Sequence, residues 1–285
     1  MTRTLSRDDF KVQRFIGRGA TGNVYLAHDP AGRPVALKIP HPETQKDPSL
    51  QRRFAREVQL ALGLSHPNLV KGFAGKAFGE DAFLALEYFP EGTLADRLKT
   101  QRPTREEAIA ILRQVAAALL YLHRLGIVHQ DVKPANVFLR GEVAKLGDFG
   151  VARTQEDGGT NERAGSPFYM APELFAGKEA TPAADAYSLG VMAYELLTGR
   201  RPFTGQSYEE LLAAHLTQAP PRLKDKNPAI AEAVMGLLAK DPERRLSVEA
   251  FLKALNQPDP PPAPAEKPKE EKPKGFFARF KRRRR

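Results

Sequence analysis

Apolar and polar positions alternate with a period of two near the start of the chain, as they do in half-buried strands. Two such runs cover residues 10–16 and 24–27, and a third strand, residues 35–39, is an apolar run with one cation in its middle. Glycines separate the first two runs, and a turn sequence at residues 29–32, Asp-Pro-Ala-Gly, separates the second from the third. The pattern therefore predicts two successive antiparallel hairpins.

A helical pattern follows the strands. Residues 47–48, Asp-Pro, have the form of a helix start, with an N-cap residue and a proline in the first helical position. Leu50, Phe54, Glu57 and Ala61 then recur at four-three-four spacing, which places them on one stripe of the helix. Glu57 lies either on the buried face, where its charge needs a partner, or at the solvated margin of the stripe.

The most apolar stretch of the chain is residues 108–122, which still contains Arg113 and Gln114. It follows a capping box at residues 104–107, Thr-Arg-Glu-Glu. The stretch therefore predicts a core helix and not a membrane span. No run of about 18 apolar residues occurs, so we expect no transmembrane segment.

The composition predicts one domain with an appendage. The chain has 285 residues and is 41% hydrophobic, enough to bury a large core in two lobes. Near Asn256 the character changes. Residues 256–274 are rich in Pro, Lys and Glu and predict a disordered, extended linker. A basic and aromatic tail, residues 275–285, follows it, so the domain itself covers residues 1–255.

Much of the positive charge belongs to the appendage. Residues 256–285 hold ten Lys or Arg against four Asp or Glu, and so account for six of the ten net positive charges. The basic balance is not evidence for a basic active-site cleft. The chain has no cysteine, which excludes disulfides, thiolate metal sites and palmitoyl or prenyl anchors, and which is consistent with a cytoplasmic location.

The turn between the first two strands carries Gly17, Gly19 and Gly22. Glycines let a hairpin backbone close over phosphate groups without Cβ clashes. The same spacing opens dinucleotide-binding folds, but a helix must follow it there, whereas a strand follows here. Lys38, in the middle of the third strand, is either an edge-strand charge or a phosphate ligand, and the glycine turn favours the ligand. Lys38 is also the natural partner of Glu57.

A second cluster of chemistry lies in the middle of the chain. Residues 129–136 read His-Gln-Asp-Val-Lys-Pro-Ala-Asn, and Asp-Phe-Gly follows at 148–150. Phosphoryl transfer needs a carboxylate for the acceptor hydroxyl and oxygen ligands for Mg²⁺. Asp131, Asn136 and Asp148 are residues of these types. Each stretch alone also fits an ordinary turn or strand end, but their order and spacing together favour phosphoryl transfer.

With these motifs, residues 10 to about 255 resemble a eukaryotic-type protein kinase domain, most like those of the bacterial Ser/Thr protein kinases. The matching motifs are G-x-G-x-x-G-x-V at 17–24, V-A-L-K ending at Lys38, Glu57, H-Q-D-V-K-P-A-N, D-F-G, Ala171-Pro172-Glu173, Asp185 and Arg245. The resemblance implies an α+β, bilobal protein kinase fold. A small β-rich N-lobe with one helix would cover residues 1 to about 88, and a larger, mostly helical C-lobe about 92–255.

The resemblance also implies ATP and Mg²⁺ as cofactors and gives the residues their roles. Asp131 would accept the proton of the acceptor, Lys133 would neutralise the γ-phosphate, and Lys38 with Glu57 would position the α- and β-phosphates. The implied metal ligands are Asn136 and Asp148. The implied nucleotide contacts are Ile16, Gly17, Gly19, Gly22, Val24, Ala36, Lys38, Glu87, Phe89 and Phe138, with Leu86 as the gatekeeper.

Lys133 narrows the class of substrate. In the family, a Lys two positions after the catalytic Asp accompanies Ser or Thr acceptors, so the resemblance implies a protein serine/threonine kinase acting on protein substrates. Two alternatives stay open. One is a catalytically weak or dead kinase-like scaffold that binds nucleotide or a partner. The other is a small-molecule phosphotransferase, which would not be expected to carry the pair formed by Glu173 and Arg245.

The sequence departs from the family pattern at three places, of which one, Ser166 in place of Thr, is conservative. Gln130 stands where most members have the Arg that binds a phosphate on the activation segment, which is the stretch between Asp148 and Glu173. The absence of this Arg argues against switching by phosphorylation. The apolar column that links the lobes aligns with two small residues, Ala61 and Gly72. Either Phe73 or another bulky neighbour fills that gap, or the active conformation is less well braced, since a cavity of a few methyl groups costs about 2 kcal/mol or more.

The tail, residues 275–285, combines six basic residues with three phenylalanines. On a short helix Phe276, Phe277 and Phe280 would share one face, with the basic side chains directed toward anionic headgroups. Stacking on single-stranded nucleic acid and a merely solvated charge run are the alternatives. We expect an anionic membrane surface as the partner and a peripheral location at the inner face of the membrane. The oligomeric state is not predicted.

Overall fold

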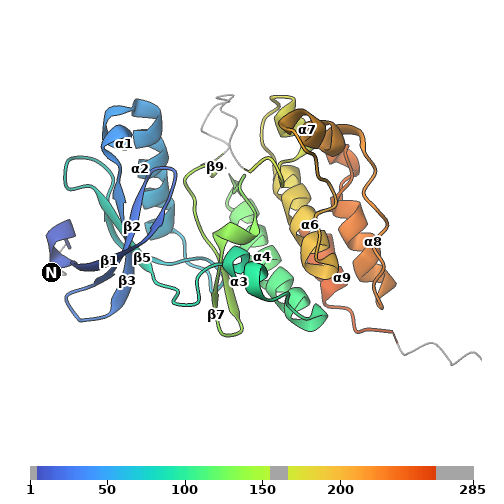
Figure 1. Cartoon of the computed structure of the whole chain (residues 1–285), viewed down its shortest axis with the longest axis horizontal. Coiled ribbons are helices and arrows are strands. Elements are labelled where there is room, and N and C mark those ends of the chain that lie inside the picture. The colour runs from blue at the N-terminus through green and yellow to red at the C-terminus, as the bar shows by residue number, and fades with distance from the viewer. Residues whose placement is uncertain (1–4, 155–165, 261–285) are drawn as a thin grey trace, which may run out of the picture.

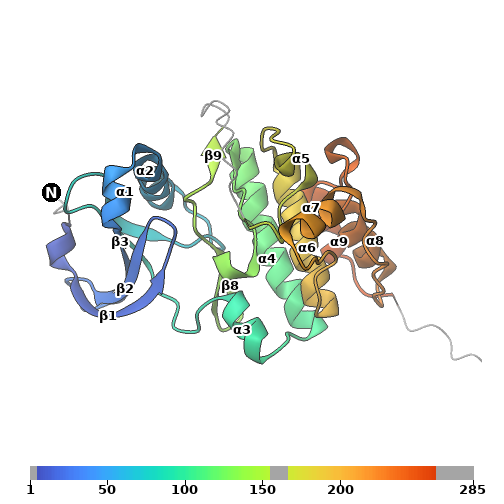
Figure 2. The ribbon, with the colours of Figure 1, turned by 45° about the horizontal axis from the view of Figure 1, so that its top comes forward.

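Two lobes make up the protein in the computed structural model, which describes residues 5–154 and 166–260 (Figure 1). The N-terminal lobe is built around a sheet, and the C-terminal lobe is built mostly of helices. A second view shows the same division (Figure 2). The α+β, bilobal fold that the sequence predicts is therefore confirmed.

Five antiparallel strands form the sheet of the N-lobe in the order β1-β2-β3-β5-β4. They are β1 (Lys11–Arg18), β2 (Gly22–His28), β3 (Pro34–Pro40), β4 (Gly72–Lys76) and β5 (Phe83–Glu87). Asp29 fixes the turn between β2 and β3, because its carboxylate accepts the N–H groups of Ala31 and Arg33. Gly32 completes this turn at a φ of 78°.

Helix α2 (Pro48–Gly63) packs against the sheet with the predicted stripe inward. Asp47 caps it by accepting the N–H groups of Ser49 and Leu50. Phe54 and Glu57 on this stripe are buried. A five-residue helix that the sequence analysis does not predict, α1 (Pro42–Lys46), precedes α2. It is shorter than the stretch that helical periodicity needs to show itself.

The C-lobe is organised around two long helices. The helices of this lobe are α3 (Leu94–Thr100), α4 (Arg105–Arg124), α5 (Pro172–Phe175), α6 (Pro182–Thr198), α7 (Tyr208–Thr217), α8 (Pro228–Leu237) and α9 (Val248–Leu255). The predicted core helix is α4, with the expected capping box between Thr104 and Glu107. Among the described residues, no helix combines the length and the apolar character that a membrane span requires.

Short strands lie where the two lobes meet. Strand β6 (Ile127–Val128) pairs with β9 (Arg153–Thr154), and β7 (Val137–Arg140) pairs with β8 (Val143–Leu146). The short 3₁₀ helices are η1 (Arg7–Asp9), η2 (Pro134–Asn136) and η3 (Pro242–Arg244). Because β6 ends just before residue 129 and β7 begins at 137, the segment 129–136 is fixed at both ends.

The chain stays attached to the C-lobe as far as Asp259. Arg105 donates to both carboxylate oxygens of Asp225, at 2.8 and 2.6 Å, and to both of Asp259, at 3.1 and 2.8 Å. Asn227 donates to the carbonyl of Pro258 at 3.3 Å. These contacts extend a few residues into the segment of changed composition. The last described residues lie on the side of the C-lobe remote from the N-lobe (Figures 1 and 2).

His215, in α7, is fully buried in the C-lobe. Lys240 donates to the hydroxyl of Tyr187 at 3.2 Å, and this hydroxyl lies 3.0 Å from Nδ1 of His215, to which it can donate. Burial, and to a smaller extent the positive charge of Lys240, lowers the pKa of His215 to about 4. The imidazole is therefore neutral in the folded protein at pH 7.

We expect the protein to lose stability as the pH falls from about 6.5 to about 4. An unfolded histidine has a pKa of about 6.5, so over this interval the unfolded chain binds a proton that folded His215 does not, which costs at most about 3 kcal/mol. Urea unfolding of the wild type and His215→Gln at neutral and acidic pH measures the effect. The variant should lose less stability on acidification, and an equal loss would assign the acid sensitivity to other groups.

Candidate active site

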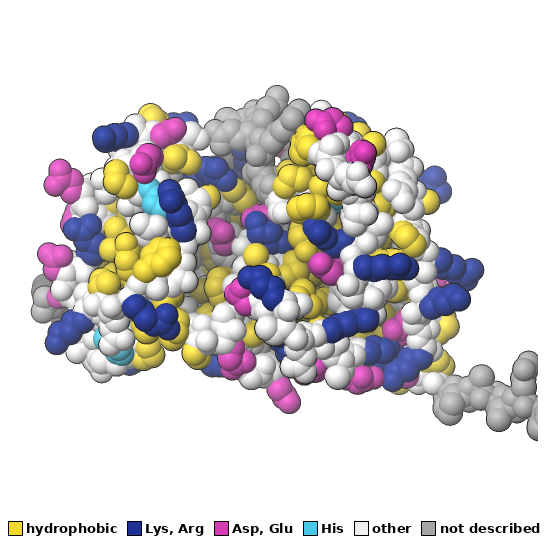
Figure 3. All heavy atoms as spheres, viewed as in Figure 1, with side chains coloured by type: hydrophobic (Ala, Val, Ile, Leu, Met, Phe, Trp, Pro, Cys, Tyr) yellow, Lys and Arg dark blue, Asp and Glu magenta, His cyan; other side chains and the backbone are white. Residues whose placement is uncertain are grey.

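A cavity of about 740 Å³ lies between the two lobes. Hydrophobic side chains are visible in the hollow between the lobes in the space-filling view (Figure 3). Strands β1, β2, β3 and β5 contribute residues from the N-lobe, and residues 131–151 contribute most of those from the C-lobe. Every nucleotide-binding, metal-binding or catalytic residue that the sequence predicts lines this cavity, except Gly22. The fold thus brings both sequence clusters to one place.

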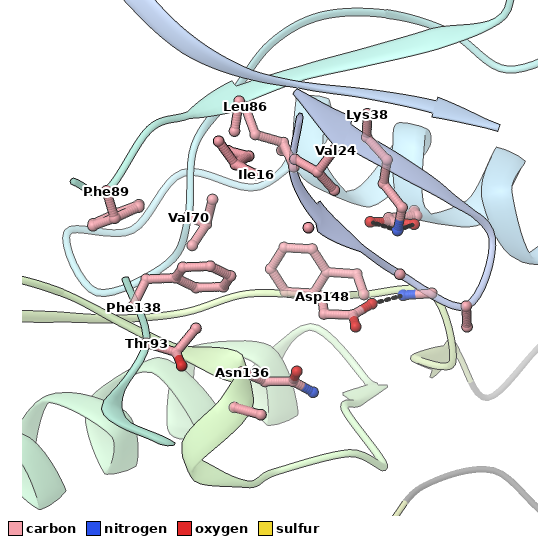
Figure 4. A pocket seen from close by; sticks show the side chains of 18 of the residues that line it. Ile16, Val24, Lys38, Val70, Leu86, Phe89, Thr93, Asn136, Phe138 and Asp148 are labelled. Atoms are coloured by element: carbon pink, nitrogen blue, oxygen red, sulfur yellow. Dashed lines mark hydrogen bonds and ion pairs between the residues drawn. The ribbon is translucent and has the colours of Figure 1, made fainter. Parts of the chain in front are cut away.

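Apolar side chains of the two lobes face one another at one end of the cavity (Figure 4). Ile16, Val24 and Leu86 come from the N-lobe, and the ring of Phe138 lies opposite them on β7. Ala36 lines the same region. A flat aromatic base fits between such surfaces, because pockets for small molecules are mostly apolar with a few placed polar groups.

Residues 87–89 connect the lobes at this end. The carboxylate of Glu87 binds Arg140 at 3.0 Å and Lys145 at 2.8 Å, both from the C-lobe. The ring of Phe89 lies 5.4 Å from the ring of Phe138. The Glu87 side chain is used in these ion pairs, and its backbone N–H donates to the carbonyl of Lys71 at 2.8 Å, so neither group is left for a nucleotide.

The glycine-rich turn covers the opposite end of the cavity. The N–H of Gly19 donates to the carbonyl of Gly22 at 2.8 Å and closes the turn. Gly22 supports the site without lining it. A Cβ at Gly22 would overlap the carbonyl of Ile39, so the glycine allows β2 to approach β3 closely.

Lys38 and Glu57 form a buried ion pair. Nζ of Lys38 lies 2.7 and 2.6 Å from the two carboxylate oxygens of Glu57. The hydroxyl of Thr21 donates to the same carboxylate at 3.3 Å. Burial lowers the pKa of Lys38, but the charges of Glu57 and Asp148 outweigh that effect, so the pKa lies above its ordinary value. Lys38 is thus held as an ammonium ion that lines the cavity.

Three donors converge on the carboxylate of Asp131. Nζ of Lys133 lies 2.7 Å from Oδ2, Nδ2 of Asn136 lies 2.9 Å from the same oxygen, and the N–H of Ser166 lies 3.0 Å from Oδ1. Asn136 also donates to the carbonyl of Asp131 at 2.8 Å. The 3₁₀ helix η2 turns the chain so that Asn136 reaches back to Asp131. These bonds fix the orientation of the carboxylate.

Asp148 has a left-handed backbone, with a φ of 65°, which non-glycine residues rarely adopt. Its Oδ1 accepts the N–H of Gly150 at 3.4 Å, drawn as a dashed line in Figure 4. Burial raises the pKa of Asp148, but the charge of Lys38 and this N–H group outweigh burial and hold the pKa below its ordinary value. Asp148 is therefore an ionised carboxylate beside Lys38.

A sequence profile with the description "Protein kinase domain" matches residues 10–256. The chain belongs to the protein kinase family. "Serine/threonine-protein kinase PknJ" of Mycobacterium tuberculosis is 36% identical over 253 residues, which are 84% of this chain and 43% of that protein. "Serine/threonine-protein kinase PknB" of the same species is 34% identical over 277 residues, 90% of this chain and 44% of that protein.

A third relative of this kinase domain is "Serine/threonine-protein kinases drp72" of Corynebacterium efficiens, which is 34% identical over 276 residues. The match covers 90% of this chain and 53% of that protein. The chain thus spans about half the length of the curated relatives it matches.

In this kinase, Asp185 of α6 holds the segment that carries Asp131. Its Oδ2 accepts the N–H of His129 at 2.8 Å, and its Oδ1 accepts the N–H of Gln130 at 2.7 Å. Nε2 of His123 lies 2.9 Å from Oδ2. Asp185 itself is fully buried. A buried carboxylate with partners on both oxygens is a rigid support for the segment 129–136.

Sequence reasoning missed three contacts of the kinase site: the Thr21 hydroxyl on Glu57, the Ser166 N–H on Asp131 and the His123 ring on Asp185. Thr21 lies inside the glycine turn, and the Ser166 contact is made by the backbone, so neither has a pattern of its own. The position of His123 could have been predicted from the helical spacing. It follows Leu119 by four positions, on the core face of α4.

Phe73 does not fill the gap expected at Ala61 and Gly72, which corrects that expectation. Phe73 is 43% exposed, with Lys71 over its ring. Instead, β4 lies directly against α2. A Cβ on Gly72 would lie 2.6 Å from the carbonyl oxygen of Ala61 and 3.2 Å from its Cβ. Close backbone packing thus takes the place of a side chain at Gly72, while Ala61 also lines the cavity.

We expect Gly72→Ala to destabilise the kinase by about 1–3 kcal/mol and to lower its activity, because the new methyl group must push α2, and Glu57 with it, away from β4. Gly63→Ala is the matched control. It lies at the end of the same helix, where a Cβ would meet nothing within 4 Å among the described residues. Urea unfolding should find this variant within about 1 kcal/mol of the wild type. Equal stability of both variants would contradict the close packing.

Proposed function

We propose that this kinase domain transfers the γ-phosphoryl group of ATP to Ser or Thr hydroxyl groups of protein substrates. The observation that carries the proposal is the convergence on one cavity of Asp131, Asp148 and the pair Lys38–Glu57. Phosphoryl transfer asks little covalent work of a protein. It depends on positioning and on charge neutralisation, and these residues supply both.

Asp131 takes the proton of the acceptor hydroxyl. As that proton leaves, the acceptor oxygen bonds to the γ-phosphorus, the bond from this phosphorus to the β–γ bridging oxygen breaks, and ADP leaves. The donors of Lys133 and Asn136 hold the Asp131 carboxylate in one orientation. Lys133, itself a cation beside Asp131, neutralises charge on the γ-phosphoryl group, and Lys38 does so on the α- and β-phosphates.

Asp148 and Asn136 fit an Mg²⁺ ion. Asp148 offers an ionised carboxylate. Asn136 donates to Asp131 through Nδ2, so Oδ1 of Asn136 is left as an acceptor that can face the ion. Oxygen ligands of this kind are those that Mg²⁺ prefers. When bound, the ion supplies neutralisation of the phosphate charge. The Ser/Thr class of acceptor is supported by Lys133 and by the names of the relatives, which are serine/threonine-protein kinases.

We expect Asp148→Ala to remove essentially all phosphoryl transfer with the fold intact, because it loses a ligand of the proposed Mg²⁺ ion. We expect Lys38→Met to lower kcat by at least about 100-fold, because it loses a cation that acts on the phosphates. Labelled ATP with Mg²⁺ and peptides containing Ser, Thr or Tyr measures the rates. Glu249→Ala and Lys253→Met, two exposed changes on α9, are the matched controls. Turnover like that of the wild type in Asp148→Ala or Lys38→Met would contradict the assignment.

We also propose that the tail attaches the kinase peripherally to an anionic membrane surface at the inner face of the membrane. Residues 275–285 lie outside the described residues, so the support is their composition, six basic residues with Phe276, Phe277 and Phe280. Near an anionic surface each Lys or Arg contributes up to about 1 kcal/mol. The contact between Arg105 and Asp259 places the start of the linker on the C-lobe, away from the N-lobe.

We expect the full chain to sediment with anionic vesicles at low salt and not with neutral ones, because attraction of the basic side chains is screened by salt. A chain ending at Pro260, which keeps the Asp259 contacts, should stay in the supernatant. The charge-matched variant Phe276→Ser, Phe277→Ser, Phe280→Ser should bind more weakly. Equal sedimentation of full and shortened chains would exclude the anchor. Release by single-stranded DNA at constant salt, without preference for anionic lipid, would favour nucleic acid instead.

A further inference from the structure

The tip of the glycine-rich turn is fastened to the start of α1. The backbone N–H of His41 donates to the carbonyl of Thr21 at 3.1 Å, and the hydroxyl of Thr44 donates to the same oxygen at 2.8 Å. Nε2 of His41 lies 3.1 Å from the carbonyl oxygen of Gly19. A carbonyl only accepts, so Nε2 carries the hydrogen of this bond. Residues 41–44 thus hold two carbonyls of the turn.

These contacts are built into the N-lobe. Thr21, His41 and Thr44 are 2%, 8% and 1% exposed. His41 occupies the N-cap position of α1, yet its side chain caps no N–H group of that helix. Ser, Thr, Asp and Asn are the residues that fill this position when capping is the purpose. The ring of His41 instead reaches across to the turn.

The turn held in this way lies on Lys38. A Cβ on Gly19 would be 3.4 Å from both Cε and Nζ of Lys38, so the turn at Gly19 lies close to the ammonium group. Nζ already has both carboxylate oxygens of Glu57 as partners. A phosphate oxygen that binds Nζ on the side of Gly19 would need the space between the turn and the ammonium group. The bond from His41 to Gly19 opposes a movement of the turn that would widen this space.

From this geometry we infer that His41 and Thr44 form a clamp that holds the glycine-rich turn down on Lys38, and that binding of a nucleotide di- or triphosphate works against the clamp. His41 is a positioning residue in this arrangement, since it acts through Gly19 and not on the nucleotide. The inference rests on the proposed nucleotide function of the cavity. His41 and Thr44 do not line the cavity, so residues outside it would help to set the affinity for the phosphate groups of the nucleotide.

The test compares ADP with adenosine, since only ADP has phosphates that would need the space between the turn and Lys38. Calorimetric titration with Mg²⁺ gives the Kd of each for the wild type, His41→Ala, His41→Gln and Thr44→Val. We expect His41→Ala to bind ADP about threefold to tenfold more tightly, the range that one net hydrogen bond supports, with adenosine unchanged. His41→Gln keeps a donor at the position of Nε2 and should restore the affinity of the wild type.

Thr44→Val keeps the shape of the side chain and removes only the hydroxyl, so it tests the clamp even where His41→Ala fails to fold. It should tighten ADP binding in the same direction, with adenosine unchanged. Unchanged or weaker ADP binding in folded variants would overturn the clamp, and so would an equal shift for ADP and adenosine. A wild type that binds neither ligand would instead overturn the nucleotide function.

Discussion

The buried ion pair between Lys38 and Glu57 is the constraint on which the arrangement of the N-lobe depends. Both residues are at most 5% exposed, and leaving either charge alone in the interior would cost about 3–5 kcal/mol. The pair therefore ties α2 to β3. The close approach of β4 at Gly72 and the Thr21 hydroxyl on Glu57 add to the same restraint. The N-lobe thus packs around a buried ion pair that lines the cavity between the lobes.

In the C-lobe, a single buried carboxylate holds the segment that carries Asp131. Asp185 is fully buried, and its two oxygens receive the N–H groups of His129 and Gln130 and the ring of His123. Asp131 then follows directly on a fixed backbone. The charge of Asp148 also raises the pKa of Lys38, so the two lobes interact electrostatically across the cavity. Each of the two charges has its own partner, Glu57 for Lys38 and the N–H of Gly150 for Asp148. Preorganised charges of this kind act without reorganisation during the reaction.

Much of this could be predicted from the sequence where periodicity and charge coincide. The spacing of Leu50, Phe54 and Glu57 defines the buried stripe of α2, and Asp47 defines its start. Helix α1 could not be predicted, because five residues show no period. The contact of Gly72 with Ala61 could not be predicted either, since it depends on how closely two backbones approach after folding. Resemblance supplied the role of Asp185, and local pattern alone would have left it an ordinary helix residue.

Gln130 separates two functions that this position combines in most members of the family. The structural function is carried by the backbone, because the N–H of residue 130 donates to Asp185 at 2.7 Å and this bond does not depend on the side chain. The loop geometry around Asp131 therefore tolerates Gln in place of Arg. The side chain is 8% exposed and neutral, so it cannot balance the charge of a phosphate. A domain with Gln at this position keeps the backbone support of the loop that carries Asp131, while a phosphate on the activation segment would have to be bound by another cation.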